Sequence, residues 1–260
     1  MKIYDLHVHT KLSSCASPEA ELDEYIKVAE ELGIELIGFT DHAWDSKVPG
    51  ASPWYQAQDY PRLFERKPSY KSDKVKVLFG AEGEFASFKL AVTRDTIKKL
   101  DYIIIPHSHI HMKGLVLPEG WESNALVAKY LVESFISLCS HPDSDLIFGI
   151  AHPFYPLGKF QKDIQEIMDL ITEEQLKECF ELANRKNIRI ELNLSCFKDA
   201  DISDMDSYPY AKILKAAGKA GCKLFIGSDS HKVYDKTDPI ILKAPEYIKS
   251  LGLNEAAFEL

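Results

Sequence analysis

Short apolar segments recur along the chain, and each has the length of a β-strand. They occupy residues 2–8, 35–40, 75–80, 101–105, 146–151, 188–194 and 223–228. Each segment is nearly continuous in apolar residues, as expected for a strand that is buried on both faces. Segments with helical periodicity lie between them. This alternation of strand and helix, repeated about seven times, predicts a parallel sheet or barrel.

Some of the intervening segments also show where a helix begins and ends. The helix before the second strand is expected to start with Ser17 as its N-cap residue and to end at Gly33. Thr172 and Gln175 have the spacing of a capping box. This pair predicts a helix that extends to about Arg185.

Residues 44–74 interrupt this rhythm with a long connection that contains four prolines, two tryptophans and three tyrosines. Connections of this length are usually either functional or disordered, and the aromatic residues argue against disorder. We expect a lid over a functional site. In this lid, Trp44, Trp54, Tyr55 and Tyr60 would present apolar surface to a substrate. A surface loop without a function is the alternative.

Composition adds bounds on the class of protein. The chain has 260 residues, of which 45% are hydrophobic and 27% are charged, and no linker divides it. We therefore expect a single domain over residues 1–260, a usual size for one α/β barrel. Five cysteines, without a CxxC pair, favour reduced thiols in a cytoplasmic protein. We find no signal-peptide pattern and no apolar run long enough to span a membrane.

Histidine and acidic residues gather directly after the strand segments, and eight of the nine histidines belong to this group. The carboxyl ends of parallel strands in a barrel face the same way, so these side chains are expected to meet at one end. The group consists of His7, His9, Asp41, His42, Glu82, Glu84, His107, His109, His111, His152, Asn193, Asp229 and His231.

The spacing of His7 and His9 explains why a buried strand would carry two imidazoles. Residues two apart in a strand point to the same side, and imidazole is the commonest transition-metal ligand. We therefore expect a metal centre. More ligands are present than one ion uses, which favours two or three divalent ions, Zn, Mn or Fe, that share carboxylates. Such sites activate water against phosphoesters.

The motifs around these residues resemble a known family. DLHVHT, FTDHA, GAEGE, PHSHIH, GIAHPF, the ELN segment and GSDSH are similar to the ordered motifs of the PHP (polymerase and histidinol phosphatase) superfamily, over residues 5 to about 231. The resemblance implies a distorted (β/α)7 barrel, similar to a TIM barrel, with a metal site at the C-terminal ends of the strands. It also implies a metal-dependent phosphoesterase. The segment YPYAKILKAAGKAGCKLFIGSDSH is most similar to the histidinol-phosphate phosphatases.

The resemblance further implies a role for each ligand. His7 and His9 would bind a first ion together with Asp229. Glu82 would bridge this ion to a second one, which His152 would also bind with a histidine of PHSHIH.

Of the three histidines in PHSHIH, His109 fits the spacing of the family best. Strand alternation would place His107 and His111 on the same side as His109, where they would contact the substrate or hydrogen-bond to a ligand.

His42 and His231 would bind a third ion. The family often has a further histidine at the position of Cys15, and a thiolate can also bind zinc, so Cys15 is the expected third ligand of this ion.

The remaining candidates surround the metal ligands. Asp41 precedes His42 and is a candidate catalytic residue that acts through its neighbours, while His231 and His111 are candidates for the general acid. The residues expected to bind substrate are His107, Asn193, Lys198, Lys232 and Trp54.

The sequence therefore predicts a phosphatase for a small phosphomonoester, with histidinol phosphate as one possibility and a hydroxide that bridges two ions as the nucleophile. The alternatives are a nucleotide phosphatase or nuclease of the same superfamily, an amidohydrolase-type enzyme, and a non-catalytic metal-binding barrel. A net charge of −9 and an isoelectric point near 5.5 disfavour long nucleic acids. A membrane partner is not expected, and the sequence predicts no oligomeric state.

Overall fold

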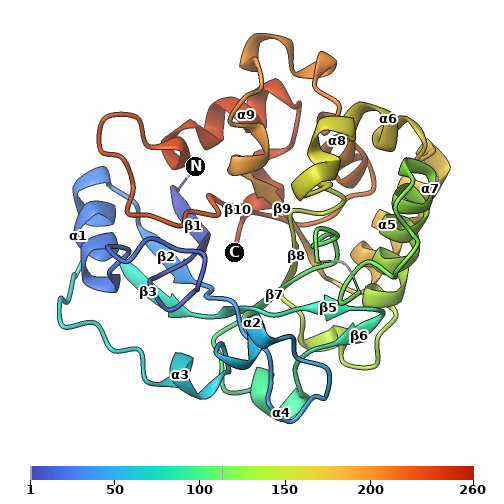
Figure 1. The fold of residues 1–260 in the computed structure, drawn as a ribbon. Coiled ribbons are helices and arrows are strands. Elements are labelled where there is room, and N and C mark those ends of the chain that lie inside the picture. The colour runs from blue at the N-terminus through green and yellow to red at the C-terminus, as the bar shows by residue number, and fades with distance from the viewer. Residues whose placement is uncertain (1, 113) are drawn as a thin grey trace.

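A ring of short parallel strands lies at the centre of the structure, and helices surround it (Figure 1). The computed structural model describes residues 2–112 and 114–260. The strands of the ring are β1 (Tyr4–Val8), β2 (Leu36–Phe39), β3 (Lys76–Phe79), β4 (Ala81–Glu82), β7 (Ile103–Pro106), β8 (Gly149–Ala151), β9 (Arg189–Asn193) and β10 (Leu224–Gly227).

Two parallel sheets supply these strands, with the orders β1-β2-β3 and β10-β9-β8-β7-β4. On one side of the ring β4 continues β3 after Gly80, so the two short strands occupy one position. On the other side a parallel bridge between Val8 and Ser230 joins β1 to the segment after β10, and the amide of His9 donates to the carbonyl of Ser230 at 2.8 Å. The predicted (β/α)7 barrel is confirmed, and each of the seven predicted strand segments overlaps a strand of the ring.

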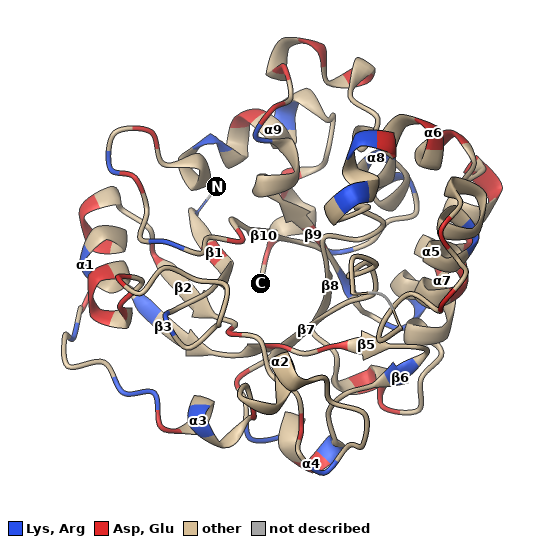
Figure 2. Cartoon of the chain, viewed as in Figure 1, with Lys and Arg blue, Asp and Glu red and all other residues tan. Residues whose placement is uncertain are grey.

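The helices that cover the ring are α1 (Leu22–Leu32), α2 (Pro53–Gln56), α3 (Pro61–Phe64), α4 (Arg94–Ile97), α5 (Asn124–Cys139), α6 (Ile164–Asp169), α7 (Glu173–Arg185), α8 (Ala211–Lys219) and α9 (Ala244–Ser250). A small antiparallel pair, β5 (Phe85–Ala86) and β6 (Lys89–Leu90), lies beside α2 (Figure 1). Charged residues lie mainly on these outer elements, and acidic residues are prominent on α1 and α6 (Figure 2). Within the described residues, every helix is too short or too polar to cross a membrane.

The predicted helix boundaries are partly confirmed. Thr172 and Gln175 form the complete capping box of α7, and Gly33 ends α1 in the left-handed conformation with φ of 73°. The prediction that Ser17 is the N-cap residue of α1 is wrong, because the helix begins only after Glu21. The amide of Ser17 instead donates to the carbonyl of His231 at 2.8 Å, which ties this segment to the mouth of the barrel.

Large side chains fill the interior of the ring where strand glycines leave space. A Cβ atom on Gly38 would lie 2.0 Å from the Tyr102 hydroxyl, and this hydroxyl donates to the carbonyl of Leu6 at 2.9 Å. A Cβ atom on Gly149 would lie 2.5 Å from the ring of Phe225. These aromatic rings occupy the space that the strand glycines leave open.

The segment of residues 44–74 contains α2 and α3 and packs against the C-terminal end of the barrel. Trp44, Tyr55 and Tyr60 are buried in the core. The expectation that all four aromatic residues present their surface to a substrate is therefore wrong for these three, because the segment needs a core of its own. Trp54 alone remains 38% exposed.

Candidate metal centre

Glu82 lies at the end of β4, and the mouth of the barrel is built around its buried carboxylate. One oxygen, Oε2, lies 3.5 Å from Nε2 of His7, 3.4 Å from Nε2 of His9 and 3.0 Å from Nδ1 of His42. The two histidines of β1 point to the same place because they are two residues apart in the strand. Their Nε2 atoms lie 3.0 Å from each other.

The second oxygen of Glu82 faces a different group of ligands. Oε1 lies 3.0 Å from Nε2 of His152 and 3.6 Å from Nε2 of His109. Glu82, His109 and His152 form one set of ligand atoms close enough to hold a metal ion, and Glu82, His7 and His9 form another. One carboxylate therefore contributes to two adjacent ligand sets.

Asp229 reaches the first set from the loop after β10. Its Oδ1 atom lies 3.5 Å from Nε2 of His7 and 3.4 Å from Nε2 of His9. The backbone of Asp229 has φ of 54°, and that of His152 has φ of 27°, in the left-handed region that L-residues seldom adopt. Such strain persists where the surrounding structure imposes it, and it concentrates at functional sites.

A third set of ligand atoms lies nearer to the surface. It consists of His9, His42 and His231. The rings of His9 and His231 stack with centroids 4.2 Å apart, and Nδ1 of His231 lies 3.0 Å from the carbonyl oxygen of Asp229. His231 is the outermost member of this set, since its side chain is 34% exposed, whereas the other two members, His9 and His42, are buried.

Four of the imidazoles share one arrangement, which fixes the ring nitrogen that faces Glu82. In each ring Nδ1 has a hydrogen-bond acceptor on the outer side, so Nδ1 carries the proton and Nε2 presents its lone pair to the centre. The pairs are His7 with Glu191 at 2.7 Å, His9 with Ser13 at 3.1 Å, His109 with Glu84 at 2.7 Å, and His152 with Ser108 at 2.9 Å.

The imidazole nitrogens and carboxylate oxygens of this centre are suitable ligands for transition-metal ions. Nδ1 of His42 is buried without a hydrogen-bond partner among the described residues, although it lies 3.0 Å from Oε2 of Glu82. Two acceptor atoms so close are expected when a cation lies between them. Imidazole and carboxylate ligands together suit Zn, Mn and Fe.

The electrostatics of the centre call for positive charge. Burial alone would raise the pKa of Glu82, but His42 and His7 outweigh it and hold this pKa well below its usual value. Burial likewise tends to lower the pKa of His7, yet Glu191, Asp229 and Glu82 raise it well above 6.5. The carboxylate of Glu82 is therefore ionised, and either protons or metal ions must balance its charge.

The structure brings together most of the predicted ligands and leaves out one. His7, His9, His42, Glu82, His109, His152, Asp229 and His231 all surround the centre. Cys15 is exposed and belongs to none of the three ligand sets among the described residues, so its role as a ligand stays a prediction. Ser13, in the turn after β1, contacts Nδ1 of His9 at 3.1 Å.

The other two histidines of PHSHIH lie in different surroundings from each other. His107 is buried and packs edge-on against the rings of Phe135 and Phe154, and its Nε2 accepts from the amide of Phe154 at 2.9 Å. Its predicted contact with substrate is therefore wrong. The alternation of a strand does not apply because β7 ends at Pro106. His111 is exposed at the rim, with its ring 5.5 Å from that of His109.

Asp41 lies behind the ligands and does not face the centre. Its Oδ1 accepts from Ser13 Oγ at 2.9 Å and from the amide of Thr10 at 2.7 Å, and its Oδ2 lies 3.3 Å from Nη1 of Arg66. Because Ser13 also holds Nδ1 of His9, Asp41 positions this ligand and does not contact a reacting group.

Asn193, one of the predicted substrate-binding residues, hydrogen-bonds to a metal-ligand candidate and to the backbone. Its amide nitrogen donates to Oδ2 of Asp229 at 3.3 Å and its oxygen accepts from the amide of Cys196 at 3.2 Å, so it orients Asp229. Lys198 and Lys232 are exposed. The ring of Trp54 lies 5.3 Å from that of His42, beside the centre.

Three contributors were not predicted from the sequence. Glu191 holds His7 and also accepts from the amide of His152 at 2.5 Å. It lies two residues before Asn193 in the ELN segment, so strand periodicity was a signal for its orientation. Arg66 and Tyr55 come from the segment of residues 44–74, and nothing in the sequence indicates their contacts.

Comparison with known proteins gives three kinds of similarity. The profile of the PHP domain family matches residues 5–195. A protein of Clostridium novyi named "Probable phosphatase" is 28% identical over 232 residues, which cover 88% of this chain and 79% of that protein. A "Probable histidinol-phosphatase" of Schizosaccharomyces pombe is 24% identical over 247 residues, which cover 84% and 77% of the two chains.

The fold is also similar to that of a solved structure. The histidinol phosphate phosphatase of Lactococcus lactis, crystallised with zinc, L-histidinol and phosphate, superimposes with a TM-score of 0.60. The match covers 97% of this chain and 95% of that one at 18% sequence identity. At this identity the likeness supports the shared barrel and leaves the site to be judged by its own geometry.

Proposed function

Because this chain belongs to the PHP domain family and is a phosphoric monoester hydrolase, we propose that its activity depends on divalent metal ions held on both sides of Glu82. The observation that carries this proposal is that the two oxygens of the Glu82 carboxylate face different ligands. Oε2 faces His7 and His9, whereas Oε1 faces His152. A carboxylate shared in this way allows two cations to lie close together.

Each ion would have its own protein ligands in addition to Glu82. His7, His9 and Asp229 would hold one ion, and His109 and His152 would hold the other. His42 and His231, with His9, form the set that would hold a third ion. When bound, such ions lower the pKa of water and offset the charge that develops on a phosphoryl group.

The residues around this centre would position the substrate and move protons. Lys198 and Lys232 are exposed cations beyond the ends of β9 and β10, where they would attract the phosphate. His231 belongs to a ligand set, whereas His111 stands free of these sets at the exposed rim. We therefore assign to His111 the transfer of a proton to the leaving oxygen.

The body of the substrate would lie against Trp54. This side chain is exposed and its ring lies 5.3 Å from that of His42, so it offers a flat apolar surface beside the cationic centre. A small phosphomonoester with a ring suits this arrangement. Histidinol phosphate has that form, and the relatives named for it support this choice.

A reconstitution screen tests the proposal. The protein is stripped with a chelator, and Mn, Zn, Fe or Mg is added before assays with histidinol phosphate, a nucleoside monophosphate, glycerol phosphate and an aryl phosphodiester. We expect no activity without metal, recovery with a transition metal, and the highest kcat/KM for a ring-bearing monoester. Full activity of the stripped protein would contradict the metal dependence. Preference for the diester would favour a nuclease, and preference for the nucleotide would favour a nucleotide phosphatase.

A further inference from the structure

Glu84 joins a metal ligand to the segment of residues 44–74. Its Oε2 atom accepts two hydrogen bonds, from the hydroxyl of Tyr55 at 2.7 Å and from Nδ1 of His109 at 2.7 Å. Its other oxygen accepts from the amide of Phe85 at 3.0 Å. All three interacting side chains are at least 94% buried. Water therefore cannot replace the Tyr55 hydroxyl without a rearrangement of the core.

This arrangement determines which nitrogen of His109 is available to a metal ion. With Nδ1–H donated to Glu84, Nε2 presents its lone pair toward Oε1 of Glu82, 3.6 Å away. If Glu84 turned, the imidazole would be free to rotate or to change its tautomer. Outer hydrogen-bond partners of this kind hold metal-binding histidines in place.

Tyr55 belongs to a single helical turn that also contacts the mouth of the site. Ser52 caps this turn by accepting from the amide of Tyr55 at 3.4 Å. Trp54, the preceding residue, packs against Tyr55 with ring centroids 4.7 Å apart and against His42 at 5.3 Å. Thus α2 presents one aromatic residue to the substrate side and the next one to the ligand side.

We propose that Tyr55 is a positioning residue of the metal centre, which fixes Glu84 so that Glu84 holds His109 in the orientation that binds the second ion. The inference rests on the proposed function, since it concerns how strongly that ion is bound. Tyr55 does not contact the ion or the substrate and acts only through Glu84. The segment of residues 44–74 thereby contributes to metal binding as well as to substrate binding.

Tyr60 provides a matched control for Tyr55. Both tyrosines are almost fully buried and come from the same segment, but the Tyr60 hydroxyl has no hydrogen-bond partner among the described residues. Tyr55→Phe removes a bond to Glu84, whereas Tyr60→Phe removes none. A difference between the two variants therefore reports on the hydrogen bond and not on the packing of a buried ring.

The experiment measures Mn and Zn binding to chelator-stripped wild type, Tyr55→Phe, Tyr60→Phe and Glu84→Gln, together with the melting temperature of each stripped protein. We expect binding of the second ion to weaken about 10-fold or more in Tyr55→Phe, as is typical when an outer partner is lost. Glu84→Gln should weaken it at least as much, and Tyr60→Phe should match the wild type. In Tyr55→Phe, kcat at a fixed subsaturating metal concentration should fall while KM for glycerol phosphate stays the same.

The outcomes separate this inference from the proposed function. If the wild type binds two ions and Tyr55→Phe binds both with the same affinities as the wild type, the positioning role of Tyr55 is overturned and the proposed function is not. Equal weakening in Tyr55→Phe and Tyr60→Phe would also overturn it, because packing would then explain the loss. If Tyr55→Phe does not fold, the affinity of Glu84→Gln for the second ion tests the inference instead. An affinity equal to that of the wild type would overturn the positioning role of Tyr55. A wild type that binds no ion would overturn the proposed function itself.

Discussion

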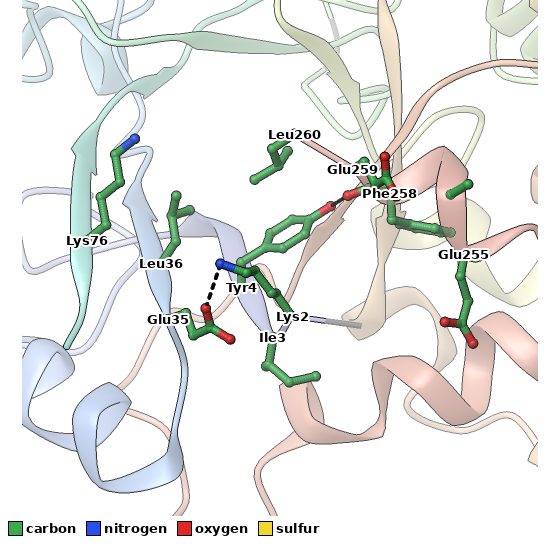
Figure 3. A pocket seen from close by; sticks show the side chains of 11 residues that line it. Lys2, Ile3, Tyr4, Glu35, Leu36, Lys76, Glu255, Phe258, Glu259 and Leu260 are labelled. Atoms are coloured by element: carbon green, nitrogen blue, oxygen red, sulfur yellow. Dashed lines mark hydrogen bonds and ion pairs between the residues drawn. The ribbon is translucent and has the colours of Figure 1, made fainter.

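The two ends of the barrel differ in the way they place charge. At the C-terminal end, histidines and carboxylates are buried together around Glu82. At the N-terminal end, a cavity of about 780 Å³ opens between Lys2, Tyr4, Leu36 and the last residues of the chain (Figure 3). Among the described residues that line this cavity there is no histidine or cysteine. Its ion pair, Lys2 with Glu35 at 3.1 Å, is exposed to solvent.

This difference shows that the volume of a cavity is a poor guide to the site in this fold. An exposed ion pair such as Lys2 with Glu35 contributes only about 0–1 kcal/mol to stability, since water screens it. Glu82 and Asp229 are ionised where water is largely excluded, so an uncompensated charge there is costly. Within the described part of the chain, the C-terminal end therefore needs positive charge, from protons or from bound cations, in a way that the N-terminal end does not. The predictions below test this contrast, starting with the largest expected effect.

Substitution of Glu82 should remove most of the activity. Glu82→Gln keeps the shape of the side chain but loses the negative charge that two cations would share. We expect kcat to fall on the order of 1,000-fold or more. The matched control is Glu35→Gln at the other end of the barrel, which should keep full activity. Near-normal turnover in Glu82→Gln with full metal occupancy would show that another carboxylate bridges the ions.

Removal of metal should destabilise the wild type. Ions that bind only the folded state stabilise it by about 2.7 kcal/mol when the free metal concentration is 100-fold above the dissociation constant. Differential scanning calorimetry with and without a chelator measures this change. Glu82→Gln should lose most of the metal-dependent shift in melting temperature, and Glu35→Gln should retain it. A shift of the same size in both variants would place the bound ions away from Glu82.

Loss of Trp54 should affect substrates unequally. Trp54→Ala removes the aromatic surface beside His42, and contacts of this kind are worth about 0.5–1.5 kcal/mol. We expect KM for a ring-bearing phosphomonoester to rise roughly 3- to 10-fold, with a smaller change for glycerol phosphate. Phe64→Ala is the control, because Phe64 is also 38% exposed but contacts Lys99 and not the site. An equal rise in KM for both substrates would show that Trp54 does not contact the ring of the substrate.

A change at the N-terminal end should alter stability without altering turnover. The Tyr4 hydroxyl donates to the carbonyl of Phe258 at 2.9 Å and ties the C-terminal segment to β1. Tyr4→Phe should lower the free energy of unfolding by about 1 kcal/mol. Urea denaturation measures this loss, and kcat/KM should equal that of the wild type. A clear fall in kcat/KM would mean that the two ends are coupled.

Much of the fold could be predicted because buried parallel strands leave a simple pattern. The strands of the ring are short and largely apolar, and the histidine and acidic ligands lie at or soon after their C-terminal ends. Most ligands could therefore be placed from the ends of the predicted strands. The same reasoning failed at His107, since it assumed that alternation continues beyond Pro106. Cys15 follows β1 in a turn, where strand periodicity does not determine the direction of a side chain.

The outer partners of the ligands were harder to predict from the sequence. Glu191 could have been placed by strand periodicity from Asn193. Arg66 and Tyr55 come from a long connection whose path depends on tertiary packing, and no local pattern fixes which aromatic ring is buried. Trp54 and Tyr55 are adjacent aromatic residues, yet Trp54 is exposed whereas Tyr55 is buried and hydrogen-bonds to Glu84.

Anomalous X-ray diffraction from crystals of the Mn- or Zn-loaded protein tests the central claim most directly. If Glu82 bridges two ions, two anomalous peaks should flank its carboxylate, one near His7 and His9 and the other near His109 and His152. For zinc, each ion should lie about 2.0–2.2 Å from a Glu82 oxygen. A single peak, or peaks that lie outside bonding distance of Glu82, would contradict the account.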